Sequence, residues 1–305
     1  MKTCRRDFLK SGLAVAATLS AGSFGRLLAT EAPAAARPLL IAVRDGSRTA
    51  MLDRALAELG GIGQFVRPGQ TVVIKPNIGW DVPPERAGNT HPELVGRLVT
   101  LCREAGAKSV SVFDHTCDQW QRCYATSGIG PAVTAAGGVM VNGDDRAMYR
   151  PVTIPRGVKL REAEVHSLVL DSDVYFNVPI LKHHSGSSMT AAMKNLMGVV
   201  WDRRFYHSND LHQCIADFAT FKAPTLNILD AWHPMVRNGP RGRSETDVVE
   251  LRSLLASADM VALDTAAARM LGQDPALIRH IPLAAELKVG TMDLDAVEVR
   301  RIKLT

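Results

Sequence analysis

Short apolar runs alternate with amphipathic segments along most of the chain. Most of these runs are continuously apolar, as in strands that are covered on both faces, whereas half-exposed strands alternate apolar and polar positions. The pattern predicts strands over residues 39–43, 71–74, 109–113, 174–176, 226–229, 260–263 and 297–302.

Helical patterns lie between these runs. Residues 50–59 end at Gly60 and Gly61, and residues 91–105 follow Thr90 as a predicted N-cap and stop at Gly106. Strands that alternate with helices are typical of parallel sheets. We therefore predict an α/β fold with a mostly parallel central sheet and helices on both faces.

The N-terminus has the features of an export signal. Arg5-Arg6-Asp7-Phe8-Leu9-Lys10 matches the twin-arginine pattern, and a modestly apolar stretch then leads to three alanines at 34–36. We predict a cleaved signal over residues 1–36, recognition by the twin-arginine translocation machinery and a periplasmic or otherwise exported product. The apolar stretch is too short and too weak for a membrane span, and we expect no stable span in the mature form. The alternative is an uncleaved amphipathic anchor.

The rest of the chain, residues 37–305, is expected to form one domain, with a candidate insertion at 144–161 that contains Pro151, Pro155 and Gly157. It carries 31 lysines and arginines against 29 acidic residues, so its charge is nearly balanced. No nucleic-acid footprint is expected from such a balance.

The cysteines show none of the spacings of zinc ribbons or ferredoxin-type clusters. An iron–sulfur cluster is therefore not expected in this chain. Cys117 and Cys123 are close enough in sequence for a disulfide in an oxidising compartment, and two free thiols are the alternative.

Polar residues follow five of the predicted strands directly. Ligands bind beyond the carboxyl ends of the strands in open α/β sheets, so such residues are expected to share one cleft. They are Lys75 and Asn77, Asp114 and His115, Asn177, Asp230, and Asp264.

The densest polar segment is 174–200. After Pro179 we expect a basic loop with Lys182 and His184, and then a helix that begins near Ser188 and carries Lys194 and Asn195. Free amides at a helix N-terminus beside lysine and histidine favour a phosphate or carboxylate.

Two chemistries could use these side chains. Asp114, His184 and Asp230 offer oxygen and nitrogen ligands for a divalent metal. Alternatively, Lys75, Lys182 and Lys194 could hold an anionic ligand without a metal. Neither the Walker loop nor the serine-hydrolase and zinc-protease motifs occur in the sequence.

Several segments resemble the domain of unknown function 362 family in the same order. They include VVIKPN (72–77), NTHPELV (89–95), the block from LKHH to KNLMG within 177–198, and VALDTAAARMLG (261–272). The resemblance implies no established reaction. It does imply recurrent motif residues, namely Lys75, Asn77, His91, Asp114, Asn177, Lys182, His184, Lys194, Asn195, Asp230 and Asp264.

The leading hypothesis is an exported enzyme that acts on a small anionic substrate with a metal or organic cofactor. Asp114, Lys182, His184 and Lys194 are the candidate catalytic residues, and Asp114, His184 and Asp230 the candidate metal ligands. The candidate ligand-binding residues are Lys75, Asn77, His91, Asn177, Asn195 and Asp264. The alternatives are a non-catalytic periplasmic protein that binds or delivers a metal or cofactor, and an accessory redox or maturation protein.

Overall fold

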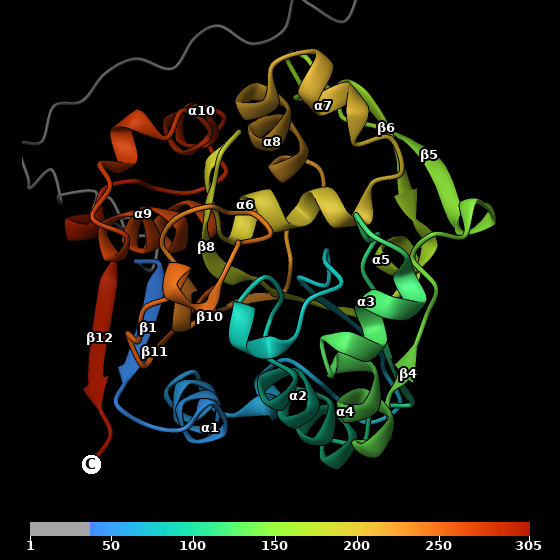
Figure 1. Cartoon of the computed structure of the whole chain (residues 1–305), viewed down its shortest axis with the longest axis vertical. Coiled ribbons are helices and arrows are strands. Elements are labelled where there is room, and N and C mark those ends of the chain that lie inside the picture. Colours follow the sequence, from blue (N-terminus) through green and yellow to red (C-terminus); the bar gives the residue numbers. More distant parts are fainter. Residues whose placement is uncertain (1–36) are drawn as a thin grey trace, which may run out of the picture. The chain divides into compact units, whose positions relative to one another are not determined.

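A ten-stranded sheet forms the centre of the protein (Figure 1). The computed structural model describes residues 37–305, so the expected signal at 1–36 lies outside the described residues. The strands of this sheet are β1 (Leu39–Arg44), β2 (Thr71–Pro76), β3 (Ser109–Val112), β4 (Val139–Met140), β7 (Val174–Val178), β8 (Ile180–His184), β9 (Ser188–Thr190), β10 (Leu226–Met235), β11 (Ser253–Ser257) and β12 (Glu298–Lys303).

The strand order is β12-β1-β11-β10-β7-β2-β3-β4, with β8 beside β10 and β9 beside β8. Strands β10, β7, β2, β3 and β4 pair in parallel, while β11 runs antiparallel to both of its neighbours. The carboxyl ends of β2, β3 and β7 therefore open on one edge of the sheet. This mostly parallel α/β arrangement confirms the predicted fold class.

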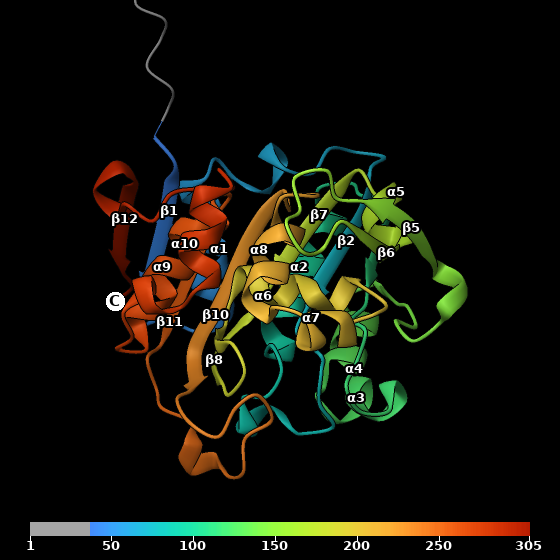
Figure 2. The ribbon, with the colours of Figure 1, turned by 90° about the horizontal axis from the view of Figure 1, so that it is seen from above.

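Helices cover both faces of the sheet (Figures 1 and 2). One apolar core holds buried side chains of α1 (Arg48–Glu58), α2 (Pro92–Glu104), α3 (Trp120–Thr126) and α4 (Ile129–Ala135). The other includes α5 (Ser167–Asp171), α6 (Ala192–Asn195), α8 (Leu211–Ala219), α9 (Met260–Met270) and α10 (His280–Glu286), with α7 (Arg204–Ser208) packed on α8. Among residues 37–305, none of these helices is long and apolar enough to cross a membrane.

The candidate insertion at 144–161 contributes a small second sheet. Strands β5 (Tyr149–Thr153) and β6 (Glu162–His166) pair antiparallel with each other and stand apart from the central sheet. Residues 37–305 cluster as one compact unit that includes this hairpin.

Two predicted elements are wrong. Residues 260–263 lie in helix α9, and the strand that enters the sheet there is β11, at Ser253–Ser257. Helix α9 is buried over most of its length, so its apolar run has no polar face to mark it as a helix.

The second error concerns the segment after Pro179. Lys182 and His184 lie in strand β8, which turns through 185–187 into β9, and the helix begins only at Ala192. No helix N-terminus stands at Ser185–Ser188, so the anion site expected from free helix amides is not formed there. Strand β10 likewise runs through to Met235, which places Asp230 inside a strand and not at its end.

Candidate functional site

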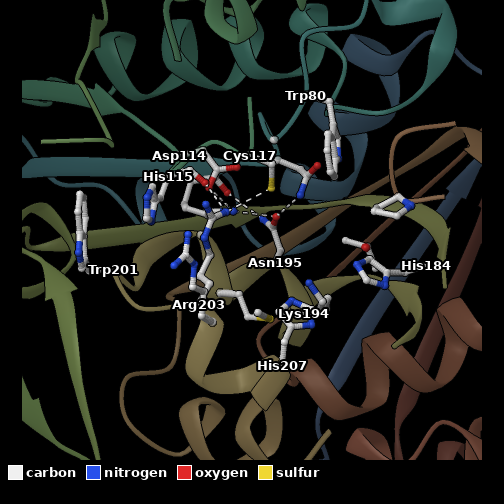
Figure 3. A pocket seen from close by; sticks show the side chains of 18 of the residues that line it. Trp80, Asp114, His115, Cys117, His184, Lys194, Asn195, Trp201, Arg203 and His207 are labelled. Atoms are coloured by element: carbon white, nitrogen blue, oxygen red, sulfur yellow. Dashed lines mark hydrogen bonds and ion pairs between the residues drawn. The ribbon is translucent and has the colours of Figure 1, made fainter. Parts of the chain in front are cut away.

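A cavity of about 950 Å³ opens at the carboxyl edge of β2, β3 and β8 (Figure 3). Its wall contains six lysines and arginines but only three acidic side chains, so it is strongly cationic. The lining residues are Lys75, Asn77, Gly79, Trp80, Asp114, His115, Cys117, Arg146, Glu164, Lys182, His184, Ser185, Thr190, Lys194, Asn195, Met197, Gly198, Trp201, Asp202, Arg203, Arg204, His207 and Pro240.

A buried ion pair forms the floor of the cavity. Lys75 Nζ lies 3.0 Å from Asp114 Oδ1, and both side chains are almost fully buried. Asp114 Oδ2 accepts a hydrogen bond from Ile78 N at 2.7 Å. Oδ2 is thus hydrogen-bonded, whereas Oδ1 is held by the ion pair and has no hydrogen-bond partner in the described chain.

Gly198 permits this pair to sit against the backbone. A Cβ on Gly198 would lie 1.9 Å from Asp114 Oδ1 and 2.6 Å from Lys75 Nζ. These distances are shorter than any real contact, so the pair requires glycine here. The glycine that closes the KNLMG motif therefore has a steric role.

Two asparagines link the pair to a second lysine, and a third supports them. Asn195 Oδ1 accepts from Lys75 Nζ at 2.8 Å and from Asn77 Nδ2 at 2.9 Å. Asn77 Oδ1 in turn accepts from Lys182 Nζ at 3.0 Å. Asn177 lies beneath the cavity and accepts from Asn195 Nδ2 at 2.9 Å. The network fixes both lysines in place.

Two lysines have pKa values near neutrality. Burial lowers the pKa of Lys182 to about 7, and the charges of Lys194 and Lys75 add to the lowering. Burial likewise lowers the pKa of Lys194 to about 8, together with the charges of Arg203 and Lys75. Lys182 donates to Asn77 and to the carbonyl of Gly88, whereas no partner for Lys194 Nζ is found within residues 37–305.

His184 presents one fixed hydrogen-bond donor. Its Nδ1 accepts from the amides of Gly186 and Ser187 at 3.0 and 3.2 Å. Burial and the neighbouring cations hold its pKa at about 2, so the ring is neutral and its hydrogen lies on Nε2. Nε2 has no partner among the described residues and is left to the cavity.

The outer wall is aromatic and basic. His115 stacks on Trp201 with ring centres 4.9 Å apart, and its Nδ1 lies 3.0 Å from Val200 O. Arg146 lies over the Trp201 ring and pairs with Glu164 at 2.6 Å. Strand β6 therefore brings Glu164 of the small second sheet to the cavity.

Loops close the remaining side. Pro240 lines the cavity, and Arg241 in the same loop pairs with Asp118 at 3.3 Å and lies over Trp80. The loop of residues 236–243 is also held by Gly239 N, which donates to His183 Nδ1 at 3.1 Å. This loop begins after β10 and reaches the cavity.

Four of the sequence-predicted residues do not line the cavity, namely Asn177, which contacts it only through Asn195, and Asp230, His91 and Asp264. Asp230 faces Arg48, with the carboxylate 3.4 Å from the guanidinium, and accepts from the amides of His91 and Trp232. His91 caps α2, and none of these side chains lines the cavity. Asp264 accepts from Ala192 N and Met193 N at 2.7 and 3.1 Å, so it caps α6 from behind.

The three expected metal ligands are therefore not together. Asp230 is absent from the cavity wall, and no group of three or more His, Cys, Asp or Glu side chains in residues 37–305 is arranged to hold a metal. Nitrogen and sulfur donors on the cavity wall include His115, His184, His207, Cys117 and Met197. Cys117 and Cys123 are both free thiols in the structure.

Several residues of the cavity wall could not be assigned to the site from the sequence. Cys117, Trp80 and Arg203 lie in loops whose positions depend on contacts between distant segments. For Arg203 the basic-aromatic stretch 201–207 was the only signal, and helix packing explains that stretch equally well. His207 of this stretch does face the cavity, whereas His212 contacts His280 instead.

The chain belongs to the family described as Domain of unknown function (DUF362), whose model matches residues 72–269. It is similar to a thylakoid-associated protein of Synechocystis sp., with 31% identity over 264 residues that cover 80% of this chain and 76% of that protein.

Two solved structures match part of this chain. The lactate racemase apoprotein of Thermoanaerobacterium thermosaccharolyticum matches with a TM-score of 0.48 and 12% identity, over 75% of this chain and 56% of that chain. A protein from Thermotoga maritima matches with a TM-score of 0.46 and 10% identity, over 78% of this chain and 59% of that chain. This chain thus spans less than two thirds of either structure.

Proposed function

We propose that the protein is an enzyme that binds a small carboxylate or phosphate compound in the cationic cavity and transfers protons with Lys182 and Lys194. The observation that carries this proposal is Lys194. Its ammonium group faces a cavity already rich in cations, and no partner for it is found within residues 37–305.

An anion would relieve this repulsion. Lys75 is neutralised by Asp114, but Lys194 and Arg204 have no ion-pair partner in the described part of the chain. Bringing a negative group between such cations gains more energy than it would in water, because the surroundings are only partly solvated. The neutral His184 would add a hydrogen bond from Nε2 to an oxygen of the ligand.

The lysines suit proton transfer. A general acid or base works best when its pKa lies near the working pH, and the pKa values of about 7 for Lys182 and about 8 for Lys194 meet this condition. The Asn77–Asn195 network holds Lys182 in place, as a catalytic group requires. Titratable groups with shifted pKa values gather at functional sites, and this supports a catalytic role for the two lysines.

In this proposal a metal or organic cofactor binds together with the substrate, and residues 37–305 alone do not supply a complete ligand set for a metal. Histidine and cysteine donors line the cavity, and a substrate or cofactor could complete a metal's ligand set with them. Export by the twin-arginine route is likewise proposed from Arg5 and Arg6 in the sequence.

Native mass spectrometry and elemental analysis of the purified protein test the proposal. We expect one small anionic compound per chain, lost on mild denaturation. A stoichiometric metal without any organic or inorganic anion would favour the metal-delivery alternative. Lys194→Met should abolish retention of the anion, and Lys159→Met, which replaces an exposed lysine away from the cavity, should not.

A further inference from the structure

Cys117 lies in the cavity in a fixed position. It follows β3 in the loop after Asp114, and its side chain is exposed to the cavity. Its amide donates to Gly79 O at 2.8 Å, which ties this loop to the one after β2. Figure 3 shows the thiol in the cavity, joined to Arg203 by a dashed line.

A guanidinium group is aimed at the sulfur. Arg203 Nη1 lies 3.4 Å from Cys117 Sγ. The same guanidinium donates to His115 O at 2.8 Å and to Thr116 O at 2.6 Å, so it is held in place by the loop that carries the cysteine. A fixed cationic donor stabilises negative charge on sulfur.

The lysines of the cavity also face this sulfur. Lys182 and Lys194 line the same cavity wall as Cys117; burial lowers the pKa of both lysines, and negative charge on Cys117 opposes this lowering. His184 is a second, independent sign of a ligand here, because it is nine-tenths buried and its Nε2 is left without a partner in the described chain.

The other cysteines of the described chain differ from Cys117 in their burial. Cys102, Cys123 and Cys214 are buried, and burial raises their pKa values to about 12, 12 and 11. Thiols of this kind are inert, because the thiolate is the reactive form. They serve as internal standards for Cys117.

We infer that Cys117 is the nucleophile of this cavity and that its substrate is a small anion with a carbonyl group, such as a 2-oxo acid. The inference rests on the proposed function. The thiolate sulfur forms a bond to the carbonyl carbon, the C=O π pair moves to oxygen, and Lys194 or Lys182 gives that oxygen a proton. The product is a hemithioacetal or hemithioketal and a neutral amine, with no oxidant or leaving group.

Alkylation of the full chain measures the reactivity of each cysteine thiol. Iodoacetate joins its CH₂ carbon to the sulfur and releases iodide, and peptide mass spectrometry assigns the label to each cysteine. We expect Cys117 to react at least about tenfold faster than Cys102, Cys123 and Cys214. Arg203→Gln should slow the reaction at Cys117 several-fold, and Arg122→Gln, at an exposed arginine outside the cavity wall, should leave it unchanged.

A matched pair of probes tests the substrate class. Glyoxylate carries an aldehyde beside its carboxylate, and glycolate has an alcohol in its place. We expect glyoxylate to raise the melting temperature more than glycolate does, and this difference to vanish in Cys117→Ser. A difference that survives in Cys117→Ser, or an unreactive Cys117 in the alkylation experiment, would overturn the inference.

The same data separate this inference from the proposed function. Stabilisation by glycolate reports anion binding alone. If glycolate binds while Cys117 reacts no faster than the buried thiols, the nucleophile is refuted and the anion site stands. If Cys117 reacts rapidly and neither acid binds, the reactive thiol stands, while the anion site and the carbonyl substrate are refuted.

Discussion

At residue level, the ammonium group of Lys194 lowers the stability of the folded protein, and the same charge favours binding of an anion. Its ammonium group is half-buried among other cations and has no partner within residues 37–305. Such a group costs free energy in the folded protein, because unfolding would return it to water. Natural proteins keep costs of this kind where a ligand offsets them.

Lys194→Met should therefore stabilise the ligand-free protein, by about 1 kcal/mol at pH 6. The pKa of Lys194 is about 8 in the folded state, below its ordinary value of 10.5. Below pH 8 the amine is charged in both states and its cost is fully present. Between pH 8 and about 10.5 the folded state has released its proton, so the wild-type protein gains stability and the advantage of the variant shrinks. Urea unfolding of both proteins at pH 6 and pH 10 checks this prediction. An equal difference between their free energies of unfolding at the two pH values would contradict it.

Gly198→Ala should cost about 3 kcal/mol, because the new methyl group must displace the buried Lys75–Asp114 pair. Gly63→Ala is the matched control, since its added Cβ meets nothing within 4 Å. We expect the control to change the free energy of unfolding by less than about 1 kcal/mol. Urea denaturation of both variants measures the difference, and equal effects would refute the steric role of Gly198.

At the scale of elements, the sequence predicted the strands that build the site better than the segments between them. Strands β2, β3 and β7 are short apolar runs with polar ends, so Lys75, Asp114 and Asn177 could be placed at one edge of the sheet. Helix α9 begins with the apolar run 260–263 and is buried over most of its length, and periodicity alone cannot distinguish such a run from a buried strand.

The error in α9 changed the interpretation of Asp264. Taken as a strand end, this residue would point to a ligand, but on α9 it caps the first turn of α6. Loop residues such as Cys117 and Arg203 could not be assigned, because their meeting depends on the packing of distant segments. No local pattern encodes such contacts.

Asp264→Ala should cost about 2 kcal/mol and loosen the turn that carries Lys194, since two buried amides of α6 would lose their acceptor. The control is Asp274→Ala, which removes an exposed cap of a short turn and should cost less than about 1 kcal/mol. Thermal unfolding measures both, and hydrogen exchange at residues 192–195 should rise only in Asp264→Ala. Unchanged exchange there would contradict the capping role.

For the whole molecule, the proposed export signal at 1–36 can be tested separately from the domain. Replacing Arg5 and Arg6 by lysine should leave the protein in the cytoplasm, because the twin-arginine machinery recognises the paired guanidinium groups. Cell fractionation followed by immunoblotting checks the location. Continued export of this variant would count against the twin-arginine assignment without touching the cavity.

The proposed function depends on one property of the domain, which is that its cationic cavity binds a small anion. Isothermal titration calorimetry with sulfate at pH 6 tests this most directly, because sulfate keeps its charge across the pH range of the lysines. We predict one saturable site per chain, about tenfold or more weaker in Lys194→Met and unchanged in Lys159→Met. Absence of saturable binding, or equal affinity in Lys194→Met and the wild-type protein, would contradict the account.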